Sequence, residues 1–479
     1  MAEPFCFIRV RGVYTDVENS WISHPAITSM VSDSENRNTN RTLAAIVIAG
    51  LVIRVTVALL FTPPLFGDDL DYVALGKLLA HGGGYELDGS PTAYRPPGYP
   101  LLLSLSFRLF GETLVPVRLA QAAADMISCL LVFSIGKKLF GDRVGLIAAG
   151  IFALFPMQIL YVSLLMTETV FTLTLLAVVR LCMERRISAG RALLGGLVLG
   201  CGTLVRPTLL LLPCALYAGR WGRRESWRSD VRAFLFMGIT CTFILIPWLL
   251  RNYDQFGRLT LTSNTGVNFW IGYHTGTSGS FAYPPGNPLL AAEGEFARAD
   301  LGMKLGLQFI REHPFLVLET LPKKWAHFFA VDYGLLMSMQ FQPDYRAVSN
   351  AGIIFSRFSW FNILLTHVPF AAVLLLCTLG IVVRARGDTS KLLFLLSPVV
   401  YWLIVHLVFF ASARYRFPID PLLMIGSAYG TDLMLRRGCV WTRARIWLFA
   451  GLAALFVSGW IAERVMINIK AAAYTYSRS

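Results

Sequence analysis

The sequence has 479 residues, of which 55% are hydrophobic and only 15% are charged, and its mean hydropathy is +0.57. Soluble domains carry roughly 25% charged residues, so this chain has too few to cover a soluble globule of its size. The formal net charge of +14 comes from short basic clusters between apolar segments, which is typical of cytoplasmic membrane loops rather than of a nucleic-acid surface. The composition therefore predicts a polytopic, all-α membrane protein that binds membrane lipids and no nucleic acid.

About eleven apolar segments are long enough, or nearly so, to cross a bilayer, for which about 20 apolar residues are needed. They cover residues 42–62, 114–136, 144–161, 163–182, 190–204, 207–219, 231–250, 362–383, 392–411, 418–434 and 445–465. Basic clusters follow alternate segments, as cytoplasmic loops do. Placing these clusters inside predicts an inside N-terminus, an outside C-terminus and a location in the plasma membrane, which in a bacterium is the inner membrane.

This path divides the chain into five parts. They are a polar cytoplasmic tail (1–41), a transmembrane module (42–250) with a first external loop (63–113), an external loop region (251–361), C-terminal transmembrane helices (362–465) and an external tail (466–479). The first apolar segment ends in Thr-Pro-Pro without a small-residue cleavage site, so we expect a retained span rather than a signal peptide. An over-long start of the reading frame is the alternative explanation of the tail.

The first external loop begins with three carboxylates in residues 67–72, GDDLDY. Here Asp68 and Asp69 could take a proton, anchor a metal or only lie at a hydrated helix N-terminus, where the helix dipole favours acidic residues. The apolar residues between positions 70 and 79 predict a short amphipathic helix, ended by three consecutive glycines at 82–84.

Residues 94–100, YRPPGYP, form a turn in which prolines fix the backbone around a single arginine, Arg95. A guanidinium held there suits a phosphate, which it can bind through two parallel hydrogen bonds. An arginine that snorkels to lipid headgroups would have the same pattern. Residues 98–110 are apolar but too short to span, so we expect a helix in the outer interface.

Two ionisable residues next to apolar segments are further candidates. Glu168 lies near the outer start of a span, where a carboxylate is costly to bury, and the alternative to function is a structural pair with an arginine. Arg206 lies at the outer break between two short spans and is the natural partner for Glu168 or for a substrate phosphate. Arg54, inside the first span, is weaker, since pairing or snorkelling explains it.

Two later regions fall on the same predicted face of the membrane. Residues 251–361 are rich in Gly, Asn, Thr, Pro and Tyr, which predicts an ordered polar lid over a cavity. Residues 413–418, ARYRFP, form a compact turn with Arg414 and Arg416 on either side of a tyrosine. This turn could clamp a phosphate or a sugar, or only anchor in the headgroup layer, where Arg and Tyr are ordinary residues.

The order of these motifs resembles the GT-C glycosyltransferases of the dolichyl-phosphate-mannose protein mannosyltransferase superfamily, especially the members similar to bacterial lipid A aminoarabinose transferases. The motifs are Asp-Asp-x-Asp-Tyr, Arg-Pro-Pro-Gly-Tyr-Pro, Thr-Glu, Leu-Val-Arg-Pro-Thr and Arg-Tyr-Arg-Phe-Pro, and the resemblance covers residues 42–435. It implies a GT-C bundle of about eleven transmembrane helices, short interfacial helices in the external loops, and catalysis by the module 42–250.

The resemblance also implies roles for single residues. Asp68 matches the aspartate of the family's first loop, four positions before the matched Tyr72, and Asp69 is its rival. Arg95 takes the place of a lysine that resembles a donor-phosphate contact. Tyr94 replaces an acidic residue beside that lysine, which argues against a metal site there.

Glu168 matches a second carboxylate of the family, and Arg206 matches a basic residue before proline. The implied reaction moves a sugar from a polyprenyl-phosphate donor to a hydroxyl of a lipid, glycan or protein on the outer face, with inversion at the anomeric carbon. Asp68 is expected to take the hydroxyl proton, and Arg95, with Arg206 or Arg414, to stabilise the leaving phosphate. No cofactor is required by this scheme, and a divalent metal stays an open alternative.

Two other functions would use the same features. A transporter or flippase of lipid-linked sugars needs the same cavity and arginines but releases no polyprenyl phosphate, and the scarcity of ionisable residues at mid-membrane disfavours it. In a non-catalytic scaffold, neutralising Asp68 would change no chemical activity. The sequence has no GxGxxG or GxxxxGK[ST] motif, in keeping with a donor that is linked to a lipid rather than to a nucleotide.

Overall fold

The computed structural model describes residues 25–65, 67–220, 222, 226–284, 286–330, 360–436 and 441–476. Its contacts divide the chain into two units, Met1–Ala45 and Ile46–Ser479. In the described part of the second unit, the regular secondary structure is helical apart from one small antiparallel hairpin, β1 (Glu86–Leu87) and β2 (Ser90–Pro91). The predicted all-α class is confirmed.

The helices follow one another closely along the chain. In order they are α1 (Pro25–Leu60), α2 (Asp68–Ala80), α3 (Gly98–Phe110), α4 (Val115–Phe140), α5 (Asp142–Leu154), α6 (Pro156–Tyr161), α7 (Glu168–Leu181), α8 (Ala189–Val205), η1 (Pro207–Leu209), α9 (Leu212–Gly219), α10 (Trp227–Phe256), α11 (Thr265–Gly272), η2 (Pro288–Ala291), α12 (Glu295–Glu312), α13 (Pro314–Phe328), α16 (Trp360–Val383), η4 (Arg386–Asp388), α17 (Thr389–Val408), α18 (Ala413–Arg416), η5 (Phe417–Ile419), α19 (Asp420–Leu435) and α20 (Arg443–Tyr476).

Six helices among the described residues are long and apolar enough to cross a membrane. They are Asn36–Leu60, Val115–Phe140, Trp227–Phe256, Leu365–Val383, Thr389–Val408 and Arg443–Ile461. The other predicted spans fall on shorter helices, so the count of eleven stays a prediction. The segment 144–161 shows one cause: it is split into α5 and α6 at Phe155, which is extended (φ −72°, ψ 118°) because a following proline disfavours helical geometry.

Small residues set the closest helix contacts in the bundle. α16 and α19 pack along Gly426 and Gly430, and a Cβ on Gly430 would lie 2.1 Å from the carbonyl oxygen of Leu376. α8 and α10 meet at Gly196, where a Cβ would lie 2.5 Å from the carbonyl oxygen of Met237. Helices in lipid associate through such close backbone packing, because lipid tails supply no hydrophobic drive between them.

A buried ion pair joins two of the spans. Arg54 of α1 donates to Asp125 of α4 and, at 2.8 Å, to the carbonyl oxygen of Ala153, and both charged side chains are fully buried. The pairing explanation of Arg54 is therefore confirmed. Removing either partner would leave an uncompensated buried charge, so the pair fixes how α1 and α4 pack.

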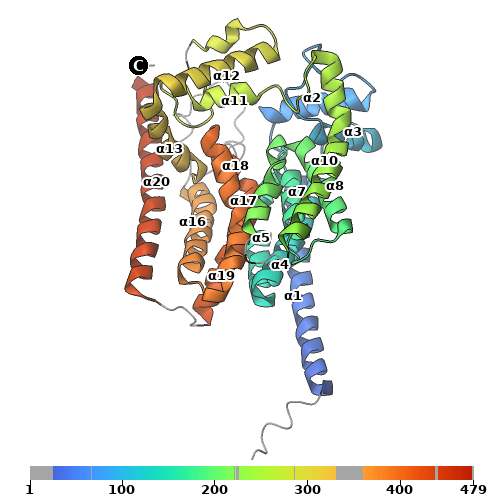
Figure 1. Cartoon of the computed structure of the whole chain (residues 1–479), viewed down its shortest axis with the longest axis vertical. Helices are drawn as coiled ribbons and strands as arrows, with labels where there is room; N and C mark the ends of the chain where they lie inside the picture. Colours follow the sequence, from blue (N-terminus) through green and yellow to red (C-terminus); the bar gives the residue numbers. More distant parts are fainter. Residues whose placement is uncertain are drawn as a thin grey trace, which may run out of the picture. The chain divides into compact units, whose positions relative to one another are not determined.

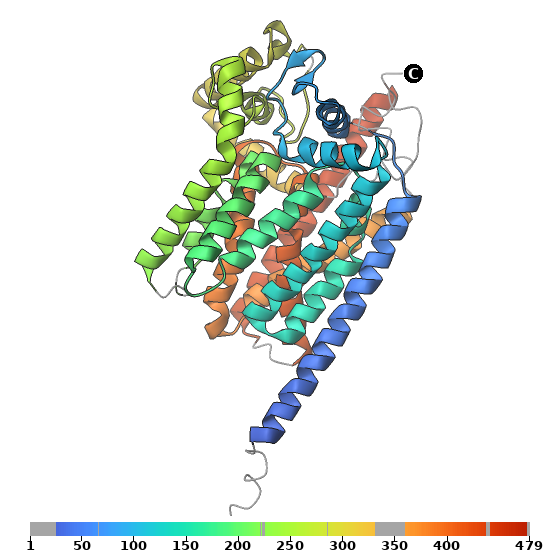
Figure 2. The same cartoon turned by 90° about the vertical axis from the view of Figure 1, so that its right-hand side faces the viewer.

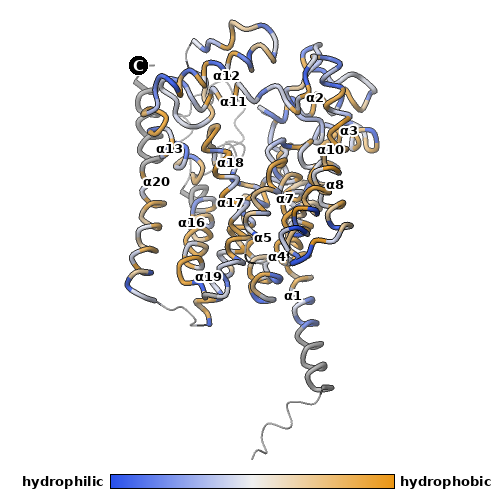
Figure 3. Tube along the Cα trace, in the orientation of Figure 1, coloured by the Kyte–Doolittle hydropathy of each residue, from blue (hydrophilic) through white to orange (hydrophobic). Residues whose placement is uncertain are grey.

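The two ends of the bundle differ. Figures 1 and 2 show α2, α3, α11 and α12 gathered beyond one end of the long helices, and we call this the capped end. In Figure 3 the helices are apolar along most of their length, and hydrophilic segments lie toward their ends. α3 leaves Leu101, Leu105 and Leu109 exposed, which is the apolar face expected of an interfacial helix.

Both predicted external loops contain ordered structure. The predicted amphipathic helix is α2, which begins at Asp68 and ends beside the glycines at 82–84. The predicted interfacial helix is α3. The described part of the region 251–361 folds into α11, η2, α12 and α13, and residues 331–359 lie outside the described residues.

Candidate active site

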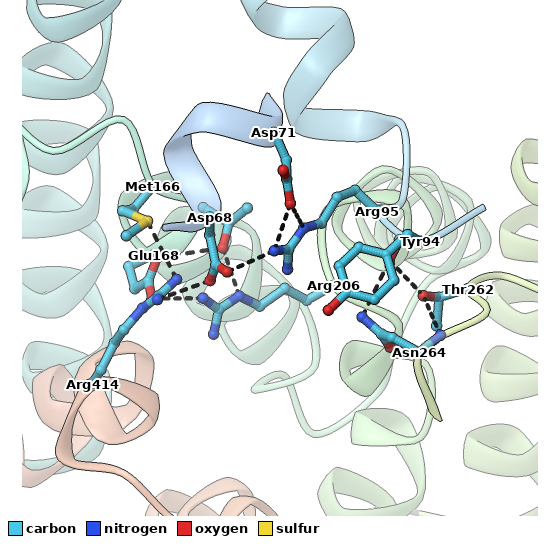
Figure 4. A network of polar contacts seen from close by, with 11 residues as sticks. Asp68, Asp71, Tyr94, Arg95, Met166, Glu168, Arg206, Thr262, Asn264 and Arg414 are labelled. Carbon is cyan, nitrogen blue, oxygen red and sulfur yellow. Dashed lines mark hydrogen bonds and ion pairs between the residues drawn. The ribbon is translucent and has the colours of Figure 1, made fainter. Parts of the chain in front are cut away.

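A cavity of about 200 Å³ opens at the capped end of the bundle. Its walls come from α2, the turn after Tyr94, the α8–η1 break, the loop before α11, the end of α17 and α18. The charged and polar side chains on its wall are Asp68, Tyr72, Arg95, Arg206, Thr208, Thr262, Asn264, Thr265, Asn268, His406, Arg414 and Tyr415. Figure 4 shows how the charged members of this set converge.

Asp68 lies at the N-terminus of α2, just after Gly67, whose φ of 68° favours glycine. Its Oδ1 accepts a hydrogen bond from Arg95 at 2.7 Å and its Oδ2 one from Arg414 at 2.9 Å. Burial alone would raise the pKa of Asp68, but the charges and hydrogen bonds of Arg414 and Arg95 outweigh it and hold the pKa far below its usual range. Asp68 is therefore ionised, and each of its oxygens is held by a guanidinium.

Arg95 is aimed by the turn that carries it. The hydroxyl of Tyr85 donates to the carbonyl oxygens of Arg95 (2.9 Å) and Pro96 (3.2 Å), which fixes the backbone. The guanidinium carbon lies 4.7 Å from the ring centroid of Tyr94 and 5.4 Å from that of Tyr72, so two aromatic faces hold it by cation–π contact.

The lid region holds the same turn from the other side. The Thr262 hydroxyl and the Asn264 amide donate to the carbonyl oxygen of Tyr94 at 3.0 and 3.1 Å. Glu295, at the start of α12, accepts hydrogen bonds from Thr92 and from the amide of Ala93, both at 2.7 Å. The predicted lid is thus bound to the residues that position Arg95.

Glu168 is the first residue of α7 and is fully buried behind the cavity wall. It accepts hydrogen bonds from Arg206, at 2.6 Å, and from Arg414. Arg206 also donates to the hydroxyl of Thr167 at 2.7 Å. With Asp68 and Asp71, Glu168 balances the charges of Arg95, Arg206 and Arg414 in one network of ion pairs beside the cavity.

Glu168→Gln is expected to destabilise the protein by about 1–3 kcal/mol, because it leaves the half-buried guanidinium groups of Arg206 and Arg414 without their shared counter-ion. The amide has nearly the same shape, so the loss comes from charge rather than from packing. Thermal unfolding of the detergent-solubilised protein measures the effect. Glu312→Gln, an exposed change on α12, is the control and should leave the melting temperature unchanged. Equal stability of wild type and Glu168→Gln would contradict the structural role.

Arg414 connects the two carboxylate centres, since it binds Asp68 and Glu168 together. Next to it, the carbonyl oxygen of Tyr415 accepts from the Trp402 indole at 2.6 Å. The Tyr415 ring stacks on His406 with centroids 4.9 Å apart and planes at 9°. The end of α17 thus supplies an aromatic wall beside the charged residues.

The structure brings most of the candidate residues together. Asp68, Tyr72, Arg95, Arg206 and Arg414 line the cavity. Of the others, Glu168 supports two of the arginines from behind, and Tyr94 stacks on Arg95.

Two candidates lie elsewhere. Asp69 is 5% exposed and does not line the cavity. Arg416 points away from it: its guanidinium donates to Asp420 at 2.9 Å and to the carbonyl oxygens of Phe328 and Ala330 at 2.7 and 2.8 Å. The spacing of the motif explains this, because two residues along a short helical turn project to different sides.

Arg414→Gln and Arg416→Gln are therefore expected to behave differently. The first should lower turnover per folded molecule at least tenfold, because it removes a charge from the cavity. The second should lower the melting temperature, because the ion pair between Arg416 and Asp420 is lost, but leave turnover per folded molecule within about twofold. Turnover normalised to monodisperse protein tests both, and equal losses of turnover would contradict the geometry.

Several residues that line the cavity or bind its side chains were not predicted as site residues. Asp71 accepts two hydrogen bonds from Arg95, at 2.8 and 2.9 Å. Asp71 lies three residues after Asp68, on the same face of α2, so the helical spacing of the two aspartates could have predicted that both face Arg95. Thr262, Asn264 and Asn268 had no such signal, because they are polar residues in a long polar loop.

Among the described residues no group of three or more His, Cys, Asp and Glu side chains is arranged to hold a metal ion. The carboxylates of Asp68, Asp71 and Glu168 are instead paired with guanidinium groups. These residues do not fit a metal site, and no step below uses a metal.

The helical membrane fold resembles that of the GT-C proteins. Residues 94–250 match the family described as dolichyl-phosphate-mannose-protein mannosyltransferase, which confirms the family resemblance of the motifs. The matched segment contains Arg95, Glu168 and Arg206, whereas Asp68 and Arg414 lie outside it. No match was found among curated protein sequences.

Solved structures share the fold. The oligosaccharyltransferase of Archaeoglobus fulgidus, in complex with Zn and sulfate, aligns with a TM-score of 0.52 and 14% identity over 89% of this chain and 52% of that protein. Its apo form aligns with a TM-score of 0.50 and 13% identity, over 90% and 55%. The chain thus spans about half the length of these proteins. ArnT from Cupriavidus metallidurans bound to undecaprenyl phosphate aligns with a TM-score of 0.41 and 16% identity, over 82% of this chain and 78% of that protein.

Proposed function

We propose that this protein is a membrane glycosyltransferase that moves a sugar from a polyprenyl-phosphate carrier to an acceptor hydroxyl, with inversion at the anomeric carbon. The observation that carries the proposal is an ionised carboxylate, Asp68, shared between Arg95 and Arg414 on the wall of a cavity. The family match of residues 94–250 supports the class of reaction. The cavity faces the periplasm or cell exterior in this proposal, because the basic clusters fall at the opposite end of the bundle.

The three arginines at the cavity supply the phosphate site. Arg95, Arg206 and Arg414 line it, and a guanidinium binds a phosphate through paired hydrogen bonds. As the anomeric carbon–oxygen bond breaks, negative charge grows on the polyprenyl phosphate. Fixed guanidinium groups in a partly dehydrated cavity stabilise that charge without having to reorganise.

Asp68 acts as the general base. It removes the proton from the acceptor hydroxyl while the hydroxyl oxygen attacks the anomeric carbon from the face opposite the phosphate, and this displacement inverts the configuration. In the free protein its two arginines make Asp68 a weak base. A bound donor phosphate competes for the same guanidinium groups, so donor binding raises the basicity of Asp68.

The polar residues of the lid form the sugar side of the cavity. Thr262, Asn264, Thr265 and Asn268 bring hydroxyl and amide groups to the wall facing Arg95. Uncharged groups of this kind hydrogen-bond sugar hydroxyls. The aromatic end of α17 lies beside them and suits the apolar start of a prenyl chain.

This scheme predicts how rate depends on pH. The free protein keeps Asp68 ionised, since its pKa is depressed and protonation sets in only as pH falls through that low value. Because kcat/KM for the donor reports the free protein, it should be flat from about pH 5 to 8. Because kcat reports the complex, its acid limb should lie at higher pH. An acid limb of kcat/KM near neutral pH would contradict the arginine-paired base.

The first test is donor turnover. The purified protein is reconstituted in liposomes with a panel of polyprenyl-phosphate sugars and a membrane-glycan extract, and release of free polyprenyl phosphate is measured. Release with one donor, dependent on the extract, supports the transferase. Movement of a donor across the membrane without release would favour a flippase and overturn the proposal.

A further inference from the structure

A second cavity, of about 570 Å³, lies at the end of the bundle opposite the candidate active site. We call it the basal cavity. It is lined by the loop after α7 and by the ends of α4, α8 and α17. α17 reaches from the basal cavity, at Lys391, to the active-site cavity, at His406. These two residues are 15 positions apart, a rise of about 22 Å, which is most of the roughly 30 Å hydrocarbon core. The two cavities therefore lie toward opposite faces of the membrane.

The lining of the basal cavity is strongly cationic. Its charged residues are Lys138, Glu184, Arg185, Arg186, Arg191 and Lys391, which are five cations and one carboxylate. Glu184 already accepts ion pairs from Lys138, at 3.1 Å, and Arg191, at 3.8 Å. Lys391 pairs with Asp388 outside the cavity. The side chains of Arg185 and Arg186 remain exposed, and their guanidinium groups have no hydrogen-bonding or ion-pair partner among the described residues.

A buried anchor holds these two arginines in place. Arg220 is 1% exposed and pairs with the fully buried Asp230 through two hydrogen bonds of 2.7 and 2.8 Å. The same guanidinium donates to the carbonyl oxygens of Glu184, at 2.6 Å, and Arg185, at 2.9 Å. The loop therefore has a fixed backbone, and little ordering is needed before its free guanidinium groups can bind a ligand.

We infer that the basal cavity binds the phosphate headgroup of an anionic phospholipid. The positive-inside rule explains why basic residues occur in the loops at this end of the bundle. That rule requires neither a cavity nor a fixed backbone. A cavity lined by basic residues at the headgroup layer has the features of an anionic-lipid site. This site is separate from the proposed active site, so the outcome of a test of one proposal does not decide the other.

The test measures lipid binding by native mass spectrometry. Delipidated full-length protein is titrated with dioleoylphosphatidylglycerol or dioleoylphosphatidylcholine. The double variant Arg185→Gln/Arg186→Gln is compared with the control Arg232→Gln/Arg443→Gln, which removes two exposed arginines from α10 and α20 at the same end. All four side chains are exposed, so both variants should fold.

Wild type and control are expected to bind phosphatidylglycerol more tightly than phosphatidylcholine. The Arg185/Arg186 variant should bind phosphatidylglycerol roughly thirtyfold more weakly, since each basic side chain near an anionic headgroup contributes roughly a fivefold gain. An unchanged affinity would overturn the inference. An equal loss of affinity in the control would also overturn the inference, because the lipid would then be attracted by the overall positive charge of this end and not by a defined site. Displacement of bound phosphatidylglycerol by millimolar glycerol phosphate would show a site for a soluble phosphate instead of a lipid.

Discussion

Asp68→Asn is expected to lower turnover by about 10²- to 10⁴-fold, the range that a general base contributes. Asparagine keeps the shape of the side chain, but its single oxygen can accept from only one of Arg95 and Arg414. Each arginine keeps a second carboxylate, Asp71 for Arg95 and Glu168 for Arg414, so the cavity should keep its geometry. Release of polyprenyl phosphate under single-turnover conditions measures the loss. Donor affinity should stay the same or increase, because the carboxylate no longer competes with phosphate for the arginines.

The neighbouring aspartates are matched controls for this substitution. Asp69→Asn should keep turnover within about tenfold, since Asp69 does not line the cavity. Asp71→Asn should have an intermediate effect, because Asp71 orients Arg95 but is not the proposed base. If Asp69→Asn removed activity while Asp68→Asn kept it, Asp69 would be the base and the assignment would be wrong.

Arg95→Gln is expected to lower turnover by about 10²- to 10³-fold, because the loss of one preorganised donor at a developing anion has this magnitude. Arg95→Lys should recover part of the loss. Lysine keeps the charge, but it lacks the planar fork that now contacts Asp68 and Asp71 together. Single-turnover rates and donor dissociation constants, measured for both variants, separate the effects on chemistry and on binding.

A purely structural role for Arg95 makes a different prediction. It would lower the melting temperature of both variants and leave the donor dissociation constant of the folded fraction unchanged. A role in phosphate binding weakens donor affinity in Arg95→Gln even where the protein is fully folded. Unchanged affinity with unchanged turnover would remove Arg95 from the site.

The sequence predicted the elements that composition and short motifs control. α2 and α3 follow from apolar spacing and from the glycine and proline residues at their ends. The convergence of Asp68, Arg95, Arg206 and Arg414 followed from their common side of the predicted membrane path, although they are far apart in the chain. Hydrophobic periodicity and the positive-inside pattern are enough for this level of detail.

Other features depend on packing that no local pattern encodes. Arg414 and Arg416 look alike in the motif. The helical turn separates their directions, and the partners that hold Arg416 include the carbonyl oxygens of Phe328 and Ala330, from a helix distant in the sequence and its end. Likewise, Asn264 reaches the cavity because its loop is tied to the carbonyl oxygen of Tyr94.

Helix lengths could not be predicted either. The apolar segment 418–434 is occupied largely by α19, only 16 residues long, in which most residues are buried by neighbouring helices. Hydropathy alone does not distinguish such a buried helix from one that crosses the bilayer in contact with lipid.

The most direct measurement is an experimental structure of the protein with bound polyprenyl phosphate in a lipid nanodisc. We expect the phosphate in the cavity at the capped end, within hydrogen-bonding distance of Arg95 and of Arg206 or Arg414, with Asp68 released from at least one guanidinium. A phosphate bound outside this cavity, with all three arginines still paired to Asp68, Asp71 and Glu168, would contradict the proposed active site.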